Sequence, residues 1–198
     1  MNKSNNKDYK LVSKDGLTKL TNSIGIRTWN QLTKHIKNLP YGRNQNRTDF
    51  GLVLSEQKGT CSSKHALLKS IADLNNVPNI ELIIGIYRMT ESNTPRIGTE
   101  LTKNAIEYIP EAHCYLKING KRTDLTSEQS KFKKIEKYII EEKKIEPKQV
   151  VEFKIDYHKK FITRWLKETN SKFEFSHIWQ IREKCIANYT IKIDYIYL

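Results

Sequence analysis

The feature that most constrains the fold is an almost wholly apolar run, Ile80–Met89 (IELIIGIYRM), which follows Pro78. A run this rich in branched residues is typical of a strand buried on both faces, because a half-exposed strand alternates polar and apolar residues. Such a strand lies in the interior of a sheet. We therefore expect a sheet in which Ile80–Met89 has a neighbouring strand on each side.

A helix is predicted shortly before this strand. From Cys61 onward, Leu67, Leu68 and Ile71 recur at the spacing of one helix face, and the helix is expected to end near Asn75. Elsewhere the patterns predict an interrupted helical stretch over 17–39, helices over 127–144, 156–168 and 174–188, and a final strand over 190–198. Together they predict an α+β fold, with the Cys61 helix packed on an antiparallel sheet and further helices at the C-terminal end.

A hairpin is predicted at Asn119-Gly120, which lies between two strand-like runs, 112–118 and 121–126. This dipeptide favours a two-residue turn, and a turn of known length fixes the register of the two strands. In that register His113 and Asp124 share one face of the hairpin at a diagonal separation of about 7–8 Å. Their side chains can close that gap, so the carboxylate can accept the imidazole N–H.

The segment Gly59-Thr60-Cys61 joins a polar loop to the predicted helix, with Thr60 or Cys61 as its cap. A thiol at this place faces the unpaired N–H groups and the positive end of the helix dipole, and both stabilise the thiolate. The thiolate nucleophile needs a proton acceptor and donor, for which His113 is the candidate, with Asp124 orienting it. Cys114 points to the opposite face of its strand and is expected in the core.

Three short motifs follow one another in the chain: GTCSSKHALL, AHCYLKI and KRTDLT. In this order and spacing, over about 41–126, they resemble the transglutaminase-like superfamily. The resemblance implies a papain-like core and a catalytic triad of Cys61, His113 and Asp124, with no cofactor and no metal. Many members have Trp where this chain has Tyr115, and the segment between His and Asp is shorter here, so an inactive member is the alternative.

The resemblance also implies a reaction. A peptide-like carboxamide would acylate Cys61 and release its amine, and water or a second amine would then take the acyl group. The expected activities are therefore those of a protease, amidase, deamidase or transglutaminase. The tetrahedral oxyanion needs two donors, for which we expect the backbone N–H of Cys61 and one side chain from Gln57, Asn46 or Tyr41.

Structural roles compete with these assignments. Cys61 alone is consistent with a small buried residue on an apolar helix face, and Asp124 with the start of a turn. His65, four residues after Cys61, is a rival base, a metal ligand or a residue that positions the neighbouring loop. A zinc site of Cys61, His65, His113 and Cys114 is not expected, because the last two point to opposite sides of one strand.

The length of 198 residues predicts a single domain over 11–198, preceded by a disordered tail over 1–10. The resemblance implies that this domain is transglutaminase-like. Within that domain, residues from about 127 to 198 form a helical extension. The three cysteines are an odd number and widely spaced, so free thiols are expected instead of a disulfide framework. No signal peptide or membrane span is recognised, and the expected location is the cytoplasm.

The chain is basic, since 35 Lys and Arg against 22 Asp and Glu give a net charge of 35 − 22 = +13. The lysines are spread along the whole chain and no arginine-rich helix or Gly/aromatic motif accompanies them. Nucleic acid is therefore not the expected main partner, and the partner that the resemblance implies is a peptide or protein carboxamide. The alternative is an inactive module that binds an acidic protein or nucleic acid through its charge.

Overall fold

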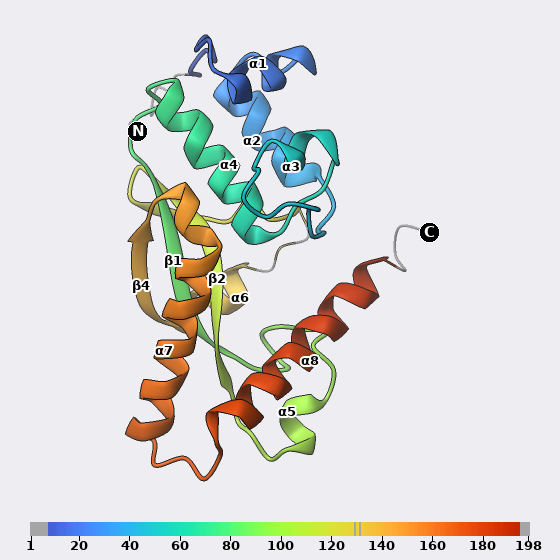
Figure 1. Ribbon diagram of the computed structural model, residues 1–198, viewed down its shortest axis with the longest axis vertical. Coiled ribbons are helices and arrows are strands. Elements are labelled where there is room, and N and C mark those ends of the chain that lie inside the picture. The colour runs from blue at the N-terminus through green and yellow to red at the C-terminus, as the bar shows by residue number, and fades with distance from the viewer. Residues whose placement is uncertain (1–7, 129, 131, 195–198) are drawn as a thin grey trace, which may run out of the picture. The chain divides into compact units, whose positions relative to one another are not determined.

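The computed structural model describes residues 8–128, 130 and 132–194 and has an α+β fold (Figure 1). Its helices are α1 (Gly16–Ser23), α2 (Trp29–Asn38), α3 (Leu52–Ser55), α4 (Cys61–Leu74), α5 (Glu100–Lys103), α6 (Phe132–Glu136), α7 (Glu152–Glu168) and α8 (Phe175–Asp194), with a 3-10 turn at Pro147–Val150. Its strands are β1 (Ile80–Met89), β2 (Ile109–Ile118), β3 (Lys121–Thr123) and β4 (Ile139–Ile145). They form one antiparallel sheet in the order β3-β2-β1-β4.

Strand β1 has the predicted bounds and lies inside the sheet, between β2 and β4. Eight of its ten residues are buried, as expected for a strand covered on both faces. The hairpin is also confirmed, because Ile118 pairs with Lys121 and Lys117 with Arg122. Asn119 and Gly120 have φ angles of 50° and 75°, the left-handed values that a two-residue type I′ turn requires.

Strand β3 is shorter than the predicted run over 121–126 and ends at Thr123. The N–H group of Leu125 donates to His65 of α4, and the N–H group of Thr126 donates to Asp124. These two donors are therefore lost to the β-ladder, and the segment 124–126 leaves the strand to contact α4. The ladder between β2 and β3 accordingly reaches the pair of Leu116 and Thr123, before Asp124.

The chain divides into two compact units, and the division crosses β1 and β2. The first unit contains the residues up to Leu82, Tyr115–Glu128 and Glu146–Lys148. Within it, α1, α2 and α3 all pack against α4, which Figure 1 shows among them. The core between these helices consists of fully buried aliphatic side chains: Leu32, Ile36, Leu67, Leu68 and Ile71.

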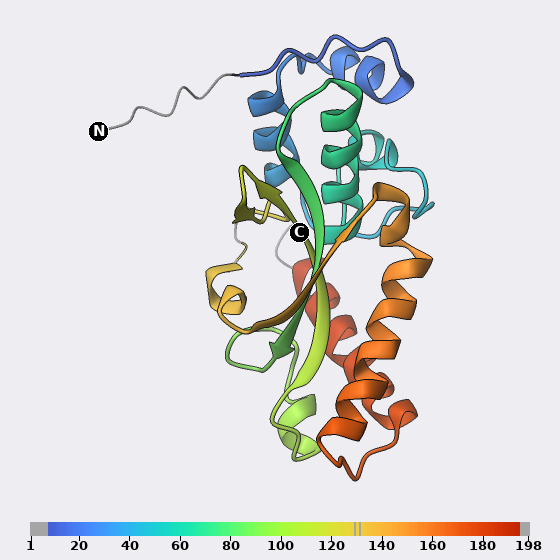
Figure 2. The same ribbon diagram turned by 90° about the vertical axis from the view of Figure 1, so that its left-hand side faces the viewer.

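The second unit contains Ile83–Cys114, 129–145 and the residues from Gln149 onward. Here α8 packs against both α5 and α7 (Figure 2), and β4 lies beside the adjoining part of β1 (Figure 1). Its core joins β1, β2 and the two long helices through Tyr87, Met89, Ile97, Leu101, Ile106, Ile109, Ile162, Ile178, Ile181 and Cys185. A buried ion pair also links β2 to α8, since Arg182 donates to both carboxylate oxygens of Glu111 at 2.7 and 2.6 Å.

Some predicted elements were wrong. The helix predicted over 127–144 is replaced by the short α6 and by strand β4, because an edge strand tolerates the Glu and Lys residues that suggested an exposed helix. The strand predicted over 190–198 was wrong as far as residue 194, because α8 continues to Asp194 without Gly or Pro to end it. Residues 195–198 lie outside the described part of the chain.

The helical stretch predicted over 17–39 is confirmed, with its interruption at Gly25, which has a φ of 84°. The helices predicted over 156–168 and 174–188 correspond to α7 and α8. Residues 1–7 of the predicted tail lie outside the described residues. The next residues of that segment are bonded, since Asp8 accepts from the N–H of Asn30 and Lys10 forms a bridge with Thr28.

Candidate thiol site at the start of α4

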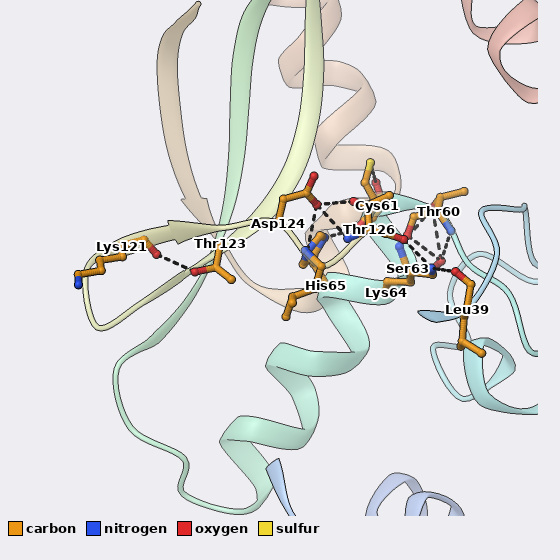
Figure 3. Close-up of polar contacts among 12 residues, drawn as sticks. Leu39, Thr60, Cys61, Ser63, Lys64, His65, Lys121, Thr123, Asp124 and Thr126 are labelled. Atoms are coloured by element: carbon orange, nitrogen blue, oxygen red, sulfur yellow. Dashed lines mark hydrogen bonds and ion pairs between the residues drawn. The ribbon is translucent and has the colours of Figure 1, made fainter. Parts of the chain in front are cut away.

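Cys61 is the first residue of α4, a helix of 14 residues. The cap residue is Thr60, whose hydroxyl accepts the N–H of Ser63, while the hydroxyl of Ser63 accepts the N–H of Thr60. This reciprocal capping box satisfies the helix end without the cysteine side chain. In Figure 3 the sulfur of Cys61 points to the side away from Ser63. Because Cys61 is the first residue of α4, its thiol lies at the helix end where the dipole favours a negative charge.

The loop before Cys61 is fixed by backbone contacts. Tyr41 pairs with Gly59 in a parallel bridge, and the N–H of Gly59 donates to the carbonyl of Pro40. A Cβ atom at Gly59 would approach the Cγ atom of Lys64 to 2.8 Å, so this close approach requires glycine. The backbone that precedes the cysteine is thus held in one position.

Lys64, one turn after Cys61, is fully buried. Its ammonium group donates to the carbonyl oxygens of Leu39 and Thr126 at 2.5 and 2.6 Å (Figure 3). Burial lowers the pKa of Lys64 to about 8, while the carboxylate of Asp124 and the thiolate form of Cys61 act in the opposite direction. A positive charge therefore lies near the cysteine inside the first unit.

Asp124 follows β3, and its side chain is only 2% exposed. Its Oδ1 atom accepts the N–H group of Thr126 at 2.9 Å and the hydroxyl of the same residue at 2.5 Å (Figure 3). This is the turn that the structural alternative for Asp124 predicted. The carboxylate is buried and held in one orientation, and it lies near the ammonium group of Lys64.

His65 connects the helix to this turn. Its Nδ1 atom lies 2.8 Å from the carbonyl oxygen of Cys61, and its Nε2 atom accepts the N–H of Leu125 at 2.8 Å. Because the amide must be the donor, Nε2 carries no proton and Nδ1 donates to Cys61. The Nε2 atom is 3.6 Å from Asp124, but in this tautomer the contact is neither a hydrogen bond nor a charged pair. His65 therefore positions the segment 124–126, the third of its predicted roles.

His113 lies on the part of β2 that belongs to the second unit, whereas Cys61 and Asp124 belong to the first. It is half-buried, its Nε2 atom is buried, and its ring lies 6.0 Å from that of Phe132. The structure thus brings Lys64, His65 and Asp124 together at the start of α4. The pairing of Cys61 with His113 stays a prediction.

The three candidate oxyanion donors differ in their surroundings. Gln57 is exposed, and its amide donates to the carbonyl of Leu54. Asn46 is also exposed, and its side-chain oxygen accepts from Thr48 in a local turn. Tyr41 is half-buried, and its bridge to Gly59 places its backbone beside the residues that precede the cysteine. Their role as donors stays a prediction.

The other two cysteines are fully buried, Cys114 in β2 and Cys185 in α8. Cys114 is in the interior, as predicted from its strand face. Burial raises the pKa of the Cys185 thiol to about 11, so this thiol is almost wholly protonated at neutral pH. Cys61, at 8% exposure, is thus the least enclosed of the three.

Within the described ranges no group of three or more His, Cys, Asp or Glu side chains has the arrangement of a metal site. No helix among the described residues is long and apolar enough to cross a membrane. Comparison of the chain with models of protein families, with curated proteins and with solved structures found no match in any of the three.

Proposed function

We propose that this protein is a cysteine-dependent hydrolase or acyltransferase that acts on peptide-like carboxamides. In this proposal Cys61 is the nucleophile, His113 the general base and Asp124 the carboxylate that orients the histidine. The scaffold would be papain-like, as the resemblance to the transglutaminase-like superfamily implies. The observation that carries the proposal is the place of Cys61: the first residue of a capped 14-residue helix, beside a buried ammonium group.

Two features of the first unit support this role. The capping bonds are made by Thr60 and Ser63, so the thiol of Cys61 is not needed to close the helix end. Positive potential comes from both the dipole of α4 and the Lys64 side chain, and a thiolate is stabilised by both. A cysteine that served only as core packing would gain nothing from either.

The proposed reaction begins when His113 accepts the thiol proton and the thiolate attacks the carbonyl carbon of the substrate. The tetrahedral intermediate then collapses to a thioester on Cys61, and the leaving amine takes the proton from His113. Water or a second amine attacks the thioester and gives its proton to His113, and the C–S bond breaks. His113 then returns this proton to the departing Cys61 thiolate, which restores the thiol. The backbone N–H of Cys61 lies in the first helical turn, where such groups point out of the helix end toward a developing oxyanion.

Alkylation with iodoacetamide at pH 7 tests the proposal, with the labelled cysteine identified by peptide mass mapping. Cys61 should react at least about tenfold faster than Cys185, whose thiol is protonated at that pH. His113→Ala should slow the labelling of Cys61, whereas His177→Ala, which removes an exposed histidine, should not. Equal rates at all three cysteines would favour the inactive binding module.

A further inference from the structure

Lys64 is a charged residue at a position where the helix pattern calls for an apolar one. It lies three, four and seven residues before Leu67, Leu68 and Ile71, on the same buried face of α4. A lysine is almost never fully buried unless its ammonium group is bound, because removing the charge from water is costly. The side chain is buried here in spite of that cost, so its contacts indicate what it does.

Those contacts join three segments that are distant in the sequence. The ammonium group donates to Leu39, at the end of α2, and to Thr126, after β3. Thr126 in turn donates to Asp124 through its N–H group and its hydroxyl. Lys64 therefore holds the turn that carries Asp124 against the first turn of α4.

The charge of Lys64 also acts on neighbouring groups. Residues three apart on a helix are neighbours on its surface, about 5–6 Å apart between Cβ atoms, so Lys64 and Cys61 lie on the same side of α4. Among the described residues of the first unit, Cys61 on α4, Asp124 after β3 and His35 on α2 are charged or titratable groups that interact with it. Burial lowers the pKa of His35, and the charge of Lys64 lowers it further.

We propose that Lys64 is a positioning residue of the Cys61 site, which fixes the Asp124 turn at the start of α4 and stabilises the Cys61 thiolate by its positive charge. This inference rests on the proposed role of Cys61 as the nucleophile. Lys64 itself forms no bond with the substrate. Its contribution is electrostatic at the sulfur and structural at the turn.

The pH dependence of Cys61 alkylation tests the electrostatic part. In Lys64→Met the stem is kept and the charge removed, so the rate at pH 7 should fall about tenfold and the midpoint should move to higher pH. The matched control is Lys69→Met, which removes a lysine from the same helix that is paired with Asp73 and should leave the midpoint unchanged. A lower rate with the same midpoint would leave Lys64 only its structural role and overturn the proposed electrostatic one.

A reciprocal measurement does not require the Lys64 variant to fold. If the thiolate stabilises the ammonium group, then Cys61→Ala must lower the titration midpoint of Lys64, since coupling between two sites is mutual. The midpoint can be followed through the ¹³Cε signal of labelled lysine, and a decrease of at least about 0.3 pH units is expected. Cys185→Ala is the control. An unchanged midpoint in Cys61→Ala would overturn the coupling.

The two proposals fail separately. If Cys61 labels no faster than the other cysteines while the Lys64 midpoint still responds to Cys61→Ala, the charge coupling stands and the proposed enzyme does not. If Cys61 is labelled rapidly in both the native protein and Lys64→Met, and the midpoint of the pH dependence is the same in both, the thiol is reactive for other reasons. Lys64 then has no electrostatic role.

Discussion

The two hydrogen bonds of His65 can be separated by substitution. His65 is fully buried, donates from Nδ1 to the carbonyl of Cys61 and accepts the N–H of Leu125 at Nε2. In His65→Asn the amide nitrogen occupies the place of Nδ1 and keeps the first bond. In His65→Gln the amide oxygen reaches the place of Nε2 and keeps the second. In His65→Ala both bonds are lost and the volume of the imidazole is left empty.

The loss of each bond leaves a different backbone group without its imidazole partner, and the two losses differ in free energy. The carbonyl of Cys61 belongs to α4 and keeps its helical acceptor role, so losing the imidazole there costs roughly 1 kcal/mol. The N–H of Leu125, on a residue that is 9% exposed, would remain buried without an acceptor, which costs roughly 1–3 kcal/mol. We therefore expect destabilisation of about 1 kcal/mol for His65→Gln, about 2–3 for His65→Asn and about 3–5 for His65→Ala.

Urea unfolding measures these differences, and amide hydrogen exchange locates them. Exchange at Leu125 should become faster in His65→Asn and His65→Ala but stay slow in His65→Gln. The amide of Thr126 is the internal control, because it donates to Asp124 and not to the imidazole. If His65→Asn is as stable as His65→Gln and Leu125 stays protected in both, the assigned tautomer and the positioning role are wrong.

Two further substitutions test the hairpin and the buried ion pair. Gly120→Ala should lower the free energy of unfolding by about 1 kcal/mol in thermal unfolding, because the φ of Gly120 is +75°. No atom lies within 4 Å of a Cβ added at Gly120 or at Gly16, so a steric clash contributes at neither position. Gly16→Ala is therefore the control and should not destabilise the protein. Glu111→Gln should lower the free energy of unfolding by about 3 kcal/mol, because it leaves Arg182 without its buried partner. Glu183→Gln, which removes the more exposed partner of Arg182, should lower it by less than about 1 kcal/mol. Burial alone would raise the pKa of Glu111, but Arg182 brings it below its usual 4.5. The ion pair therefore stabilises the fold above that pH. As the pH falls below 4.5, the native protein should lose this contribution to its free energy of unfolding. Glu111→Gln lacks the carboxyl group and should not show this loss.

The elements that the sequence predicts well are those fixed by neighbouring residues. The hairpin follows from Asn119-Gly120, since both positions need left-handed backbone. The helix from Cys61 and the strand Ile80–Met89 follow from apolar patterns that are complete within the element. In each case the deciding interactions are local, so the bounds of β1 agree with the prediction.

The errors lie where distant segments decide the structure. The residues 139–145 are rich in Glu and Lys and favour an exposed helix, but pairing beside β1 makes them an edge strand. Strand β3 ends early because His65, about 60 residues away, takes the N–H of Leu125. No local pattern contains that information.

The part of the candidate site that could be predicted is the place of Cys61 at the start of a helix. Lys64 was not recognised, although its position on the apolar face, at helical spacing from Leu67 and Ile71, was a signal present in the sequence. Its partners, Leu39 and Thr126, are 25 and 62 residues away, so nothing in the sequence showed that its charge could be buried. The buried lysine became recognisable only with the fold.

The capping box has a practical consequence for work with this protein. Because Thr60 and Ser63 close the end of α4 between themselves, residue 61 can be exchanged without loss of a capping bond. If Cys61 is the nucleophile as proposed, Cys61→Ala would keep these capping bonds but lack the thiol that the substrate acylates. Such a variant could hold an uncleaved substrate long enough for mass spectrometry to identify it.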